Sequence, residues 1–361
     1  MVAFPAMLGG SPELIDVRPD ERLDESRLAE YLREKLECAD RPLSLRQFGG
    51  GHANLTYLLR FGAGEGALEY VLRRPPLGPV AKRSHDMHRE YRALSKLWRG
   101  FDKAPRAFVY CSDPDVIGAD FLVMERRRGI VVRDRIPPEF GGGLDPVANR
   151  KLSEVVIDTL VEFHQVDPVR VGLEDLGHPV GFLERQVKGW AERCERAKTE
   201  AAPVADEVVR WLLANLPESP TATLVHNDWK LDNMAIAADD PGRCVAVYDW
   251  DMCTLGDPLC DLGTLLGLWS DPGEALAGSN PMPTQTPGFL SRDAAANRYA
   301  ERSGIDAGDI AYYVVFGTFK MGVVLQQIYV RFHRGQTQDR RFAGLGQLAH
   351  GLYQLAADRR P

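Results

Sequence analysis

Residues 224–234, LVHNDWKLDNM, place a histidine, an aspartate and an asparagine in the pattern H-x-D-x-x-x-x-N. Asp228 is a carboxylate that could take a proton from a hydroxyl group if a rigid loop held it in place. Asn233, further along the same stretch, offers an amide oxygen of the kind that hard cations prefer as a ligand. The pattern therefore predicts a loop at which an alcohol is activated beside a bound cation.

A second carboxylate, Asp249, follows in the sequence YDWD. Residues 233–237 and 244–250 are apolar and strand-like, and ADDPGR between them is a good turn sequence. A hairpin built from these segments would bring Asp249 next to Asn233, where both could bind Mg²⁺ together with phosphate groups and water. The chemistry that this arrangement predicts is phosphoryl transfer, in which positioning and charge neutralisation supply most of the catalysis.

The elements that must position this loop fall into two parts. An amphipathic helix over 24–38 is followed by a strand–turn–strand–turn–strand pattern over 43–74 and a helix over 84–99. Two apolar strands come next, so the first part predicts a small, mostly antiparallel sheet with one long helix. The second part begins with a loop at 136–146, and its predicted helices are 149–166, 181–198 and 205–216.

Length and composition restrict the class of protein. A chain of 361 residues with 44% hydrophobic and 26% charged residues can bury a large core, divided between two lobes or domains. The net charge of -7 argues against a general nucleic-acid binder. None of the six cysteines forms a C-x-x-C pair, so we expect reduced thiols in a cytoplasmic protein rather than structural zinc.

The most apolar run, residues 311–330, is long enough to span a bilayer, but Lys320, Gln326 and Gln327 interrupt it. It therefore predicts a buried core helix, and we expect no membrane partner. The N-terminal stretch has no basic region and too short an apolar core for a signal peptide. The sequence does not indicate the oligomeric state.

The motif HNDWKLDN has the spacing of the protein-kinase catalytic loop, and YDWD stands where the kinase D-F-G would be. With YDWDMCTLGDPLCDLG and FHQVD, it makes the chain resemble the aminoglycoside-phosphotransferase-like kinases from about residue 40 to 335. VGFLERQVKGW and YVLRRPP are most similar to the branch that is fused to acyl-CoA dehydrogenases in animals and stands alone in many bacteria. The resemblance implies an α+β, bilobal protein-kinase-like fold. Its N-lobe, a small antiparallel sheet with one long helix, would occupy residues 1–125, and a larger, mostly helical C-lobe would occupy 126–361.

The resemblance also implies ATP and Mg²⁺ as cofactors and a role for each residue of the two motifs. Asp228 would be the catalytic base, and Lys230 could touch the transferring phosphate. Asn233 and Asp249 would hold the magnesium. Asp251 could bind a second magnesium or contact the substrate, and both interpretations stay open.

A nucleotide site upstream of the loop is implied in the same way. Arg73, on the third strand, would contact the ATP phosphates, and Glu90, on the following helix, would position it. The loop that covers the phosphates would include Gly50, Gly51, His52 and Asn54. The main chain that borders the adenine would be that of Met124, Glu125 and Arg126.

Three residues are implied as supports of the catalytic loop. His226 would fix the loop by hydrogen bonds, and Asp257 and Asp261 would brace it. The chain also departs from the kinase pattern, because the third-strand cation is an arginine instead of a lysine, so Arg74 or Lys82 could take its place. No A-P-E sequence follows YDWD, which counts against a protein substrate.

Two classes of function therefore remain, beside a protein kinase that the missing signals disfavour. The first is an ATP-dependent kinase for a small-molecule hydroxyl, on an aminoglycoside-type sugar or a hydroxyacyl-CoA. The second is a catalytically silent nucleotide-binding module that acts through partners. The intact base and metal ligands favour the kinase. Residues 262–361 contain ten Lys or Arg and eight Asp or Glu, which counts mildly against a polycationic acceptor.

Overall fold

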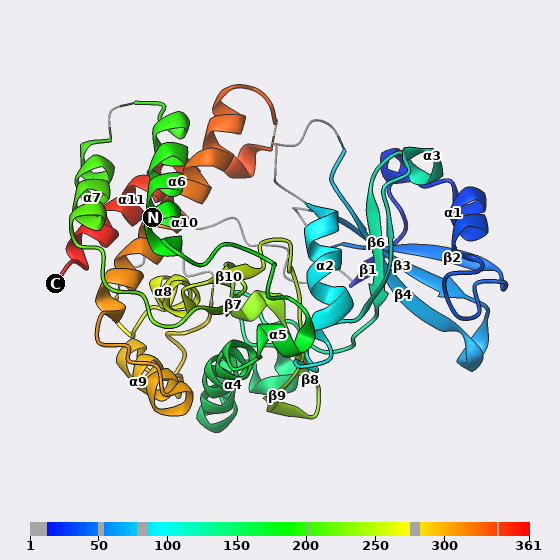
Figure 1. Ribbon diagram of the computed structural model, residues 1–361, viewed down its shortest axis with the longest axis horizontal. Helices are drawn as coiled ribbons and strands as arrows, with labels where there is room; N and C mark the ends of the chain where they lie inside the picture. Colours follow the sequence, from blue (N-terminus) through cyan, green and yellow to red (C-terminus); the bar gives the residue numbers. More distant parts are fainter. Residues whose placement is uncertain (1–12, 50–53, 78–85, 201, 275–281, 338) are drawn as a thin grey trace.

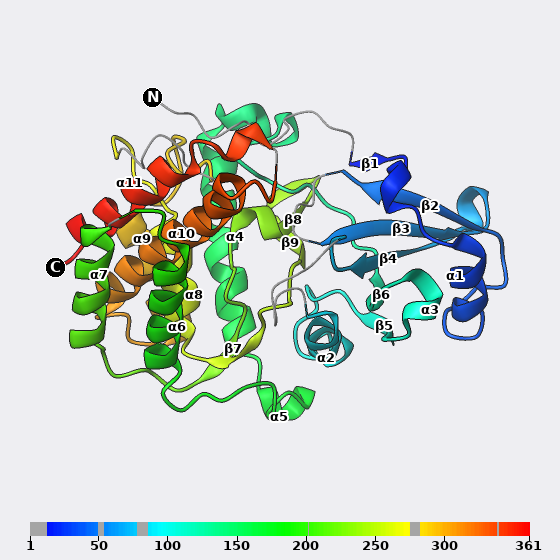
Figure 2. The ribbon, with the colours of Figure 1, turned by 90° about the horizontal axis from the view of Figure 1, so that it is seen from above.

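The computed structural model describes residues 13–361 except 50–53, 78–85, 201, 275–281 and 338. It has the expected α+β, bilobal architecture. A lobe built on one antiparallel sheet occupies one end of the molecule, and a larger lobe of helices occupies the other (Figure 1). The same separation is visible after a rotation by 90° (Figure 2).

The sheet of the smaller lobe has six strands in the order β1-β2-β3-β4-β6-β5, and each neighbouring pair is antiparallel. Alternate residues of β3, Leu55, Tyr57, Leu59 and Phe61, are buried in one core, as the period of a strand requires. The strands are β1 Leu14–Ile15, β2 Leu43–Phe48, β3 Leu55–Phe61, β4 Leu68–Arg74, β5 Ala107–Cys111 and β6 Phe121–Glu125.

Helix α2, Met87–Leu97, lies between this sheet and the helical lobe (Figure 1). It begins after Asp86, whose side chain accepts a hydrogen bond from the backbone N–H of Arg89. Leu94 and Leu97 on its apolar face are fully buried in the core that continues into the larger lobe. This packing fixes the orientation of α2 and therefore the position of Glu90 between the two lobes.

The larger lobe surrounds two short antiparallel pairs of strands. The pair β8 and β9 forms the predicted hairpin, although β9 begins at Asp240, inside the predicted turn 238–243, and β7 pairs with β10. The elements of this lobe are α4 Pro146–His164, α5 Pro168–Val171, α6 Phe182–Ala197, α7 Pro203–Ala214, β7 Thr223–Val225, β8 Met234–Ala237, β9 Asp240–Val247, β10 Thr254–Gly256, α8 Pro258–Gly267, α9 Arg292–Ser303, α10 Ile310–His333 and α11 Leu345–Asp358.

Helix α10 is the apolar run noted in the sequence. Its length and composition would allow it to cross a membrane, but 72% of its most apolar window is buried inside the protein. It packs against α8 and α11. A Cβ atom on Gly317 would lie 2.4 Å from the carbonyl oxygen of Gly263, so the close approach of α8 and α10 requires glycine at this point. As predicted, the run is a core helix of this fold.

Local elements differ from the predictions at four places. The first helix, α1 Glu25–Leu32, ends earlier than expected. The expected loop at 136–146 contains a 3-10 turn, Pro138–Gly143. The short helix α3, Pro114–Ile117, and strand β1 were not expected, because each has too few residues to show a periodic pattern.

Candidate active site

A buried carboxylate holds the loop that follows β7 by hydrogen bonds to its backbone. Asp261, on α8, accepts hydrogen bonds from the backbone N–H groups of His226 and Asn227, both at 2.6 Å. Asn227 has a φ of 66°, a left-handed conformation that is uncommon for a residue other than glycine. These two bonds fix the backbone directly before Asp228.

Asp261 is itself supported by two residues on other helices. The Nε2 atom of His164 lies 3.3 Å from its carboxylate, and the Nδ1 atom of the same ring lies 2.7 Å from the hydroxyl of Tyr299. Burial opposes the charge of Asp261, but His164 and the loop N–H groups lower its pKa below the ordinary value. Asp261 therefore stays ionised and accepts from the backbone of the loop that the resemblance expects it to brace.

The substitution Asp261→Asn should destabilise the protein by about 1–3 kcal/mol, because an amide NH₂ would face a backbone N–H that cannot reverse its bond. Asp257→Asn is the matched control. Asp257 accepts from the hydroxyls of Ser219 and Tyr313, at 2.7 Å each, and hydroxyls can turn to accept instead. Urea unfolding of both variants would measure the difference, and equal losses would contradict the bracing role of Asp261.

His226 uses both ring nitrogens within the loop. Its Nε2 lies 2.9 Å from the carbonyl oxygen of Tyr248, and its Nδ1 accepts from the backbone N–H of Asp228 at 3.2 Å. A ring that donates through one nitrogen and accepts through the other is neutral. His226 thus ties the catalytic loop to the end of the β8–β9 hairpin.

The carboxylate of Asp228 is oriented by two donors on one of its oxygens. Its Oδ2 accepts from Asn233 Nδ2 at 2.9 Å and lies 3.2 Å from Lys230 Nζ. Although burial acts against the charge of Lys230, the carboxylates of Asp228 and Asp232 raise its pKa above the ordinary value. A charged lysine therefore stands beside the predicted base, and neither contact occupies Oδ1 of Asp228.

The hairpin brings Asn233 and Asp249 together as predicted. The backbone N–H of Tyr248, next to Asp249, donates to the carbonyl oxygen of Asn233 at 2.8 Å. Asp249 has a φ of 68°, the second left-handed non-glycine residue at this site. Backbone strain of this kind is concentrated at functional sites in proteins.

The donor atoms at Asn233 and Asp249 fit a magnesium ion. Asn233 directs its NH₂ group to the carbonyl and the carboxylate oxygens of Asp228, at 2.8 and 2.9 Å, which leaves its Oδ1 for a cation. Asp249 binds Arg73 through Oδ1, and Oδ2 is not part of that bond. Two oxygen ligands suit an ion that takes its other ligands from phosphates and water. Among the described residues, no group of three or more His, Cys, Asp or Glu could hold a metal.

Arg73 joins the two lobes at this site. Its guanidinium lies 2.5 Å from Glu90 Oε1 and 2.8 Å from Asp249 Oδ1. Glu90 is fully buried, and Arg73 is 7% exposed. The neighbouring Arg74 instead donates to the carbonyl oxygen of Ile117, so it does not take the place of Arg73. Lys82, the other alternative, lies outside the described residues.

Carboxylates crowd the space around this arginine. Burial first, and then the charges of Asp249 and Glu90, raise the pKa of Asp251 to about 7. Arg73 acts in the opposite direction on both Asp249 and Asp251. A site with this excess of negative charge is suited to a cation, and the two roles expected for Asp251, a second cation or a substrate contact, stay predictions.

Two tryptophans that the sequence analysis did not single out anchor the chain next to Asp228 and Asp249. Trp229 follows Asp228, Trp250 follows Asp249, and both indoles are almost fully buried. Both pack on Phe163 of α4, with ring centroids 5.8 and 5.0 Å away. The repeated Asp-Trp pair in the sequence was the available signal for this common anchor.

The remaining predicted site residues are less central. Gly50, Gly51 and His52 lie outside the described residues, and Asn54 is buried just before β3. Met124 and Glu125 end β6, and the side chain of Arg126 turns to Glu69 at 2.5 Å. The contact of this segment with adenine stays a prediction.

Asp257, the second aspartate expected to brace the loop, lies at the start of α8. Asp257 caps the first turn of α8, where it accepts from the backbone N–H of Leu259 at 2.9 Å. Its other partners, Ser219 and Tyr313, belong to the packing around α8 and α10. Among the described residues, the direct contacts of these two aspartates with the loop come from Asp261, one helical turn later, and the bracing role of Asp257 stays a prediction.

Compared with known protein families, residues 44–289 match the phosphotransferase enzyme family, APH. The chain belongs to this family. Among solved structures, this phosphotransferase-family chain is similar to a candidate aminoglycoside phosphotransferase of Ralstonia eutropha JMP134. The TM-score is 0.77 and the identity 26%, over 93% of this chain and 99% of that one.

More distant structures share the fold of this phosphotransferase-family member. Choline kinase of Cryptosporidium parvum matches with a TM-score of 0.62 and 9% identity, over 93% of this chain and 95% of that chain. The ADP-bound aminoglycoside phosphotransferase APH(2'')-Ib matches with a TM-score of 0.53 and 14% identity, over 92% of this chain and 99% of that chain. The predicted kinase-like fold is confirmed.

Curated relatives identify the branch of the phosphotransferase family. Acyl-CoA dehydrogenase family member 10 of Mus musculus is 28% identical over 99% of this chain and 33% of its own length. Acyl-CoA dehydrogenase family member 11 of Gallus gallus is 30% identical over 89% of this chain and 41% of its own length. This chain thus spans about a third to about two fifths of the length of these relatives, and the predicted resemblance to the branch fused to acyl-CoA dehydrogenases is confirmed.

Proposed function

We propose that the protein transfers the γ-phosphate of ATP, in the presence of Mg²⁺, to a hydroxyl group of a small molecule. The observation that carries the proposal is the meeting of three motif residues at one point. Asn233 binds Asp228 directly, and the hairpin places Asp249 beside Asn233. A base and two oxygen ligands for a cation are the parts that phosphoryl transfer to an alcohol needs.

Each residue then has a task that its position supports. Asp228, held by Asn233 and Lys230 on Oδ2, would accept the proton of the acceptor hydroxyl. Lys230 would neutralise charge on the transferring phosphate, and Arg73 would bind the phosphates of ATP. Asn233 and Asp249 would hold Mg²⁺, which when bound neutralises phosphate charge and aligns the phosphates.

We propose that the acceptor is an alcohol carried on an acyl-CoA, and we favour it over an aminoglycoside-type sugar. The relatives over most of this chain are named acyl-CoA dehydrogenase family members. Residues 262–361, in the lobe expected to receive the acceptor, carry ten basic and eight acidic residues. A region without an acidic excess suits an anionic thioester better than a polycation.

The test is Mg²⁺-dependent turnover of ATP with a panel of short hydroxyacyl-CoAs, aminoglycosides, amino alcohols and sugars. Phosphorylation of one class, absent without Mg²⁺, is the expected result. Turnover with none of them, together with no binding of Mg·ADP, would overturn the proposal. Tight Mg·ADP binding without transfer would favour a silent nucleotide-binding module.

Replacing Asp249 by asparagine should weaken Mg²⁺-dependent binding of ADP about tenfold or more, equivalent to about 1.4 kcal/mol. The amide lacks the charge that attracts the cation, and asparagine tolerates the left-handed backbone at this position. Calorimetric titration with ADP, with and without Mg²⁺, separates the two contributions. An unchanged affinity in the presence of Mg²⁺ would contradict the metal-binding role.

A further inference from the structure

Helix α10 carries a buried lysine whose side chain ends at the catalytic loop. Lys320 is 8% exposed and lies between buried apolar residues of a core helix. Its Nζ donates a hydrogen bond to the carbonyl oxygen of Asn227 at 2.5 Å. The ammonium also lies 5.5 Å from the centre of the Trp190 ring, at a distance typical of a cation–π contact.

A lysine at this buried position lowers the stability of the fold. Among the described residues, no carboxylate oxygen lies within 4.0 Å of its Nζ. Burial lowers the pKa of Lys320, while the carboxylates of Asp228 and Asp261 act in the opposite direction from further away. An ammonium buried without a direct ion-pair partner costs stability, and such a cost is expected where it serves function.

The contact of Lys320 completes a clamp on a single peptide unit. The carbonyl of Asn227 and the N–H of Asp228 belong to the same rigid plane. Lys320 holds the carbonyl, and His226 Nδ1 accepts from the N–H at 3.2 Å. Asn227 is further fixed by its own N–H to Asp261 and by its side-chain amide to the carbonyl oxygen of Met252 at 3.0 Å.

We propose that Lys320 is a positioning residue that holds the peptide plane between Asn227 and Asp228 and so aims the catalytic carboxylate. The role in transfer rests on the function proposed above, whereas the role in ordering the loop does not. Without the ammonium, the carbonyl of Asn227 would have no donor from α10. The left-handed turn could then relax, and the Asp228 side chain would turn with it.

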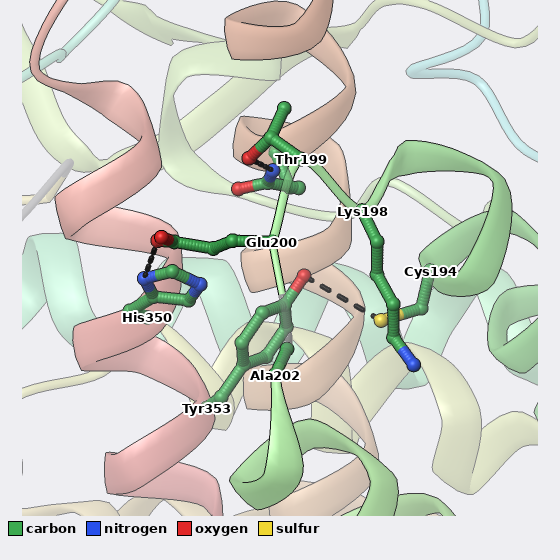
Figure 3. Close-up of a pocket in the computed structure, with 8 residues that line it drawn as sticks. Cys194, Lys198, Thr199, Glu200, Ala202, His350 and Tyr353 are labelled. Atoms are coloured by element: carbon green, nitrogen blue, oxygen red, sulfur yellow. Dashed lines mark hydrogen bonds and ion pairs between the residues drawn. The ribbon is translucent and has the colours of Figure 1, made fainter.

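Lys320→Met tests the proposal, and Gln326→Met is the matched control. Gln326, on the same helix, is 3% exposed and donates to the carbonyl oxygen of Ala197 at 3.0 Å. Gln326 and its second partner, Thr199, line the small pocket shown in Figure 3, and all the residues that line this pocket lie outside the stretch 224–234. Both variants therefore remove a buried donor to a backbone carbonyl from α10, but only one touches the loop.

Two readouts apply to each variant. The first is kcat and KM for ATP, with the best acceptor of the panel or, without one, with water as the acceptor. Lys320→Met should lower kcat between about tenfold and a hundredfold, with KM for ATP within about twofold of wild type. The second is amide hydrogen exchange of the peptide 224–234, which should become about tenfold faster. Gln326→Met should change neither readout.

If Lys320→Met does not fold, Lys320→Gln provides a second variant. The glutamine amide keeps a hydrogen-bond donor but not the charge. Its kcat should therefore lie between that of Lys320→Met and that of wild type. Wild-type kcat in Lys320→Met, or loop exchange no faster than in Gln326→Met, would overturn the proposal. A wild-type protein that neither binds Mg·ADP nor consumes ATP would overturn the proposed function instead. The exchange measurement would then decide the positioning role alone.

Discussion

The substitution Asp228→Asn should reduce phosphate transfer by about 10²–10⁴-fold, the usual contribution of a positioned general base. Asparagine has the same shape, so the contacts with Asn233 and Lys230 lose charge but not geometry. Binding of Mg·ADP should stay within about threefold of wild type, since the ligands expected for the metal are untouched. Steady-state kinetics and calorimetry on the same preparation measure both effects.

Asp239→Asn serves as the control for this prediction. Asp239 lies in the turn of the β8–β9 hairpin, where its side chain is 77% exposed and pairs with Arg243. It carries the same change of charge on the same lobe without contact with the site. Turnover of Asp228→Asn at the level of Asp239→Asn would show that another group removes the proton.

The geometry of the loop at 224–234 and its approach to Asp249 were predictable because these residues are close in the sequence. The spacing of His226, Asp228 and Asn233 defines one turn of chain, and a recognisable turn sequence closes the hairpin that returns to Asp249. The alternation of β3 and the one-sided apolar face of α2 likewise follow from short periods in the sequence. Local sequence patterns of this kind are sufficient to predict a structure when the contacts within it also join residues that are close in the sequence.

The supports of the loop were not predictable in the same way. His164, Tyr299 and Lys320 lie on three helices that are distant in the sequence from the loop, and the packing of those helices brings them to it. In the sequence, Lys320 reads as an interruption of an apolar run. Whether its side chain reaches the loop depends on how closely α8 and α10 approach at Gly263 and Gly317, and no short sequence pattern specifies that distance.

Arg73→Met should destabilise the protein by about 3–5 kcal/mol, because it leaves two carboxylates without their shared partner in a buried site. Arg73 spans from Glu90 to Asp249 with separate nitrogens. Lysine offers a single ammonium, so Arg73→Lys should restore only part of the stability. Arg74→Met is the control, since Arg74 is equally buried and, within the part of the chain that the structure describes, donates to the carbonyl oxygen of Ile117 and pairs with no carboxylate.

The loss in Arg73→Met should also depend on pH. Burial already raises the pKa of Glu90 to about 7, although Arg73 acts to lower it, so removing the arginine raises that pKa further. An acid whose pKa is raised by folding contributes stability at low pH and loses it as the pH rises through the folded-state value. Urea unfolding should therefore show a smaller difference from wild type near about pH 5 than near about pH 8.

The double variant Arg73→Met with Glu90→Gln decides whether the orphaned carboxylate is the cause. Glutamine cannot ionise, so the double variant should regain part of the lost stability and lose much of the pH dependence. Additive losses from the two substitutions would mean that Arg73 and Glu90 stabilise the fold independently. In that case the bridge between the lobes would depend on Arg73 and Asp249, and the pairing with Glu90 would contribute only packing.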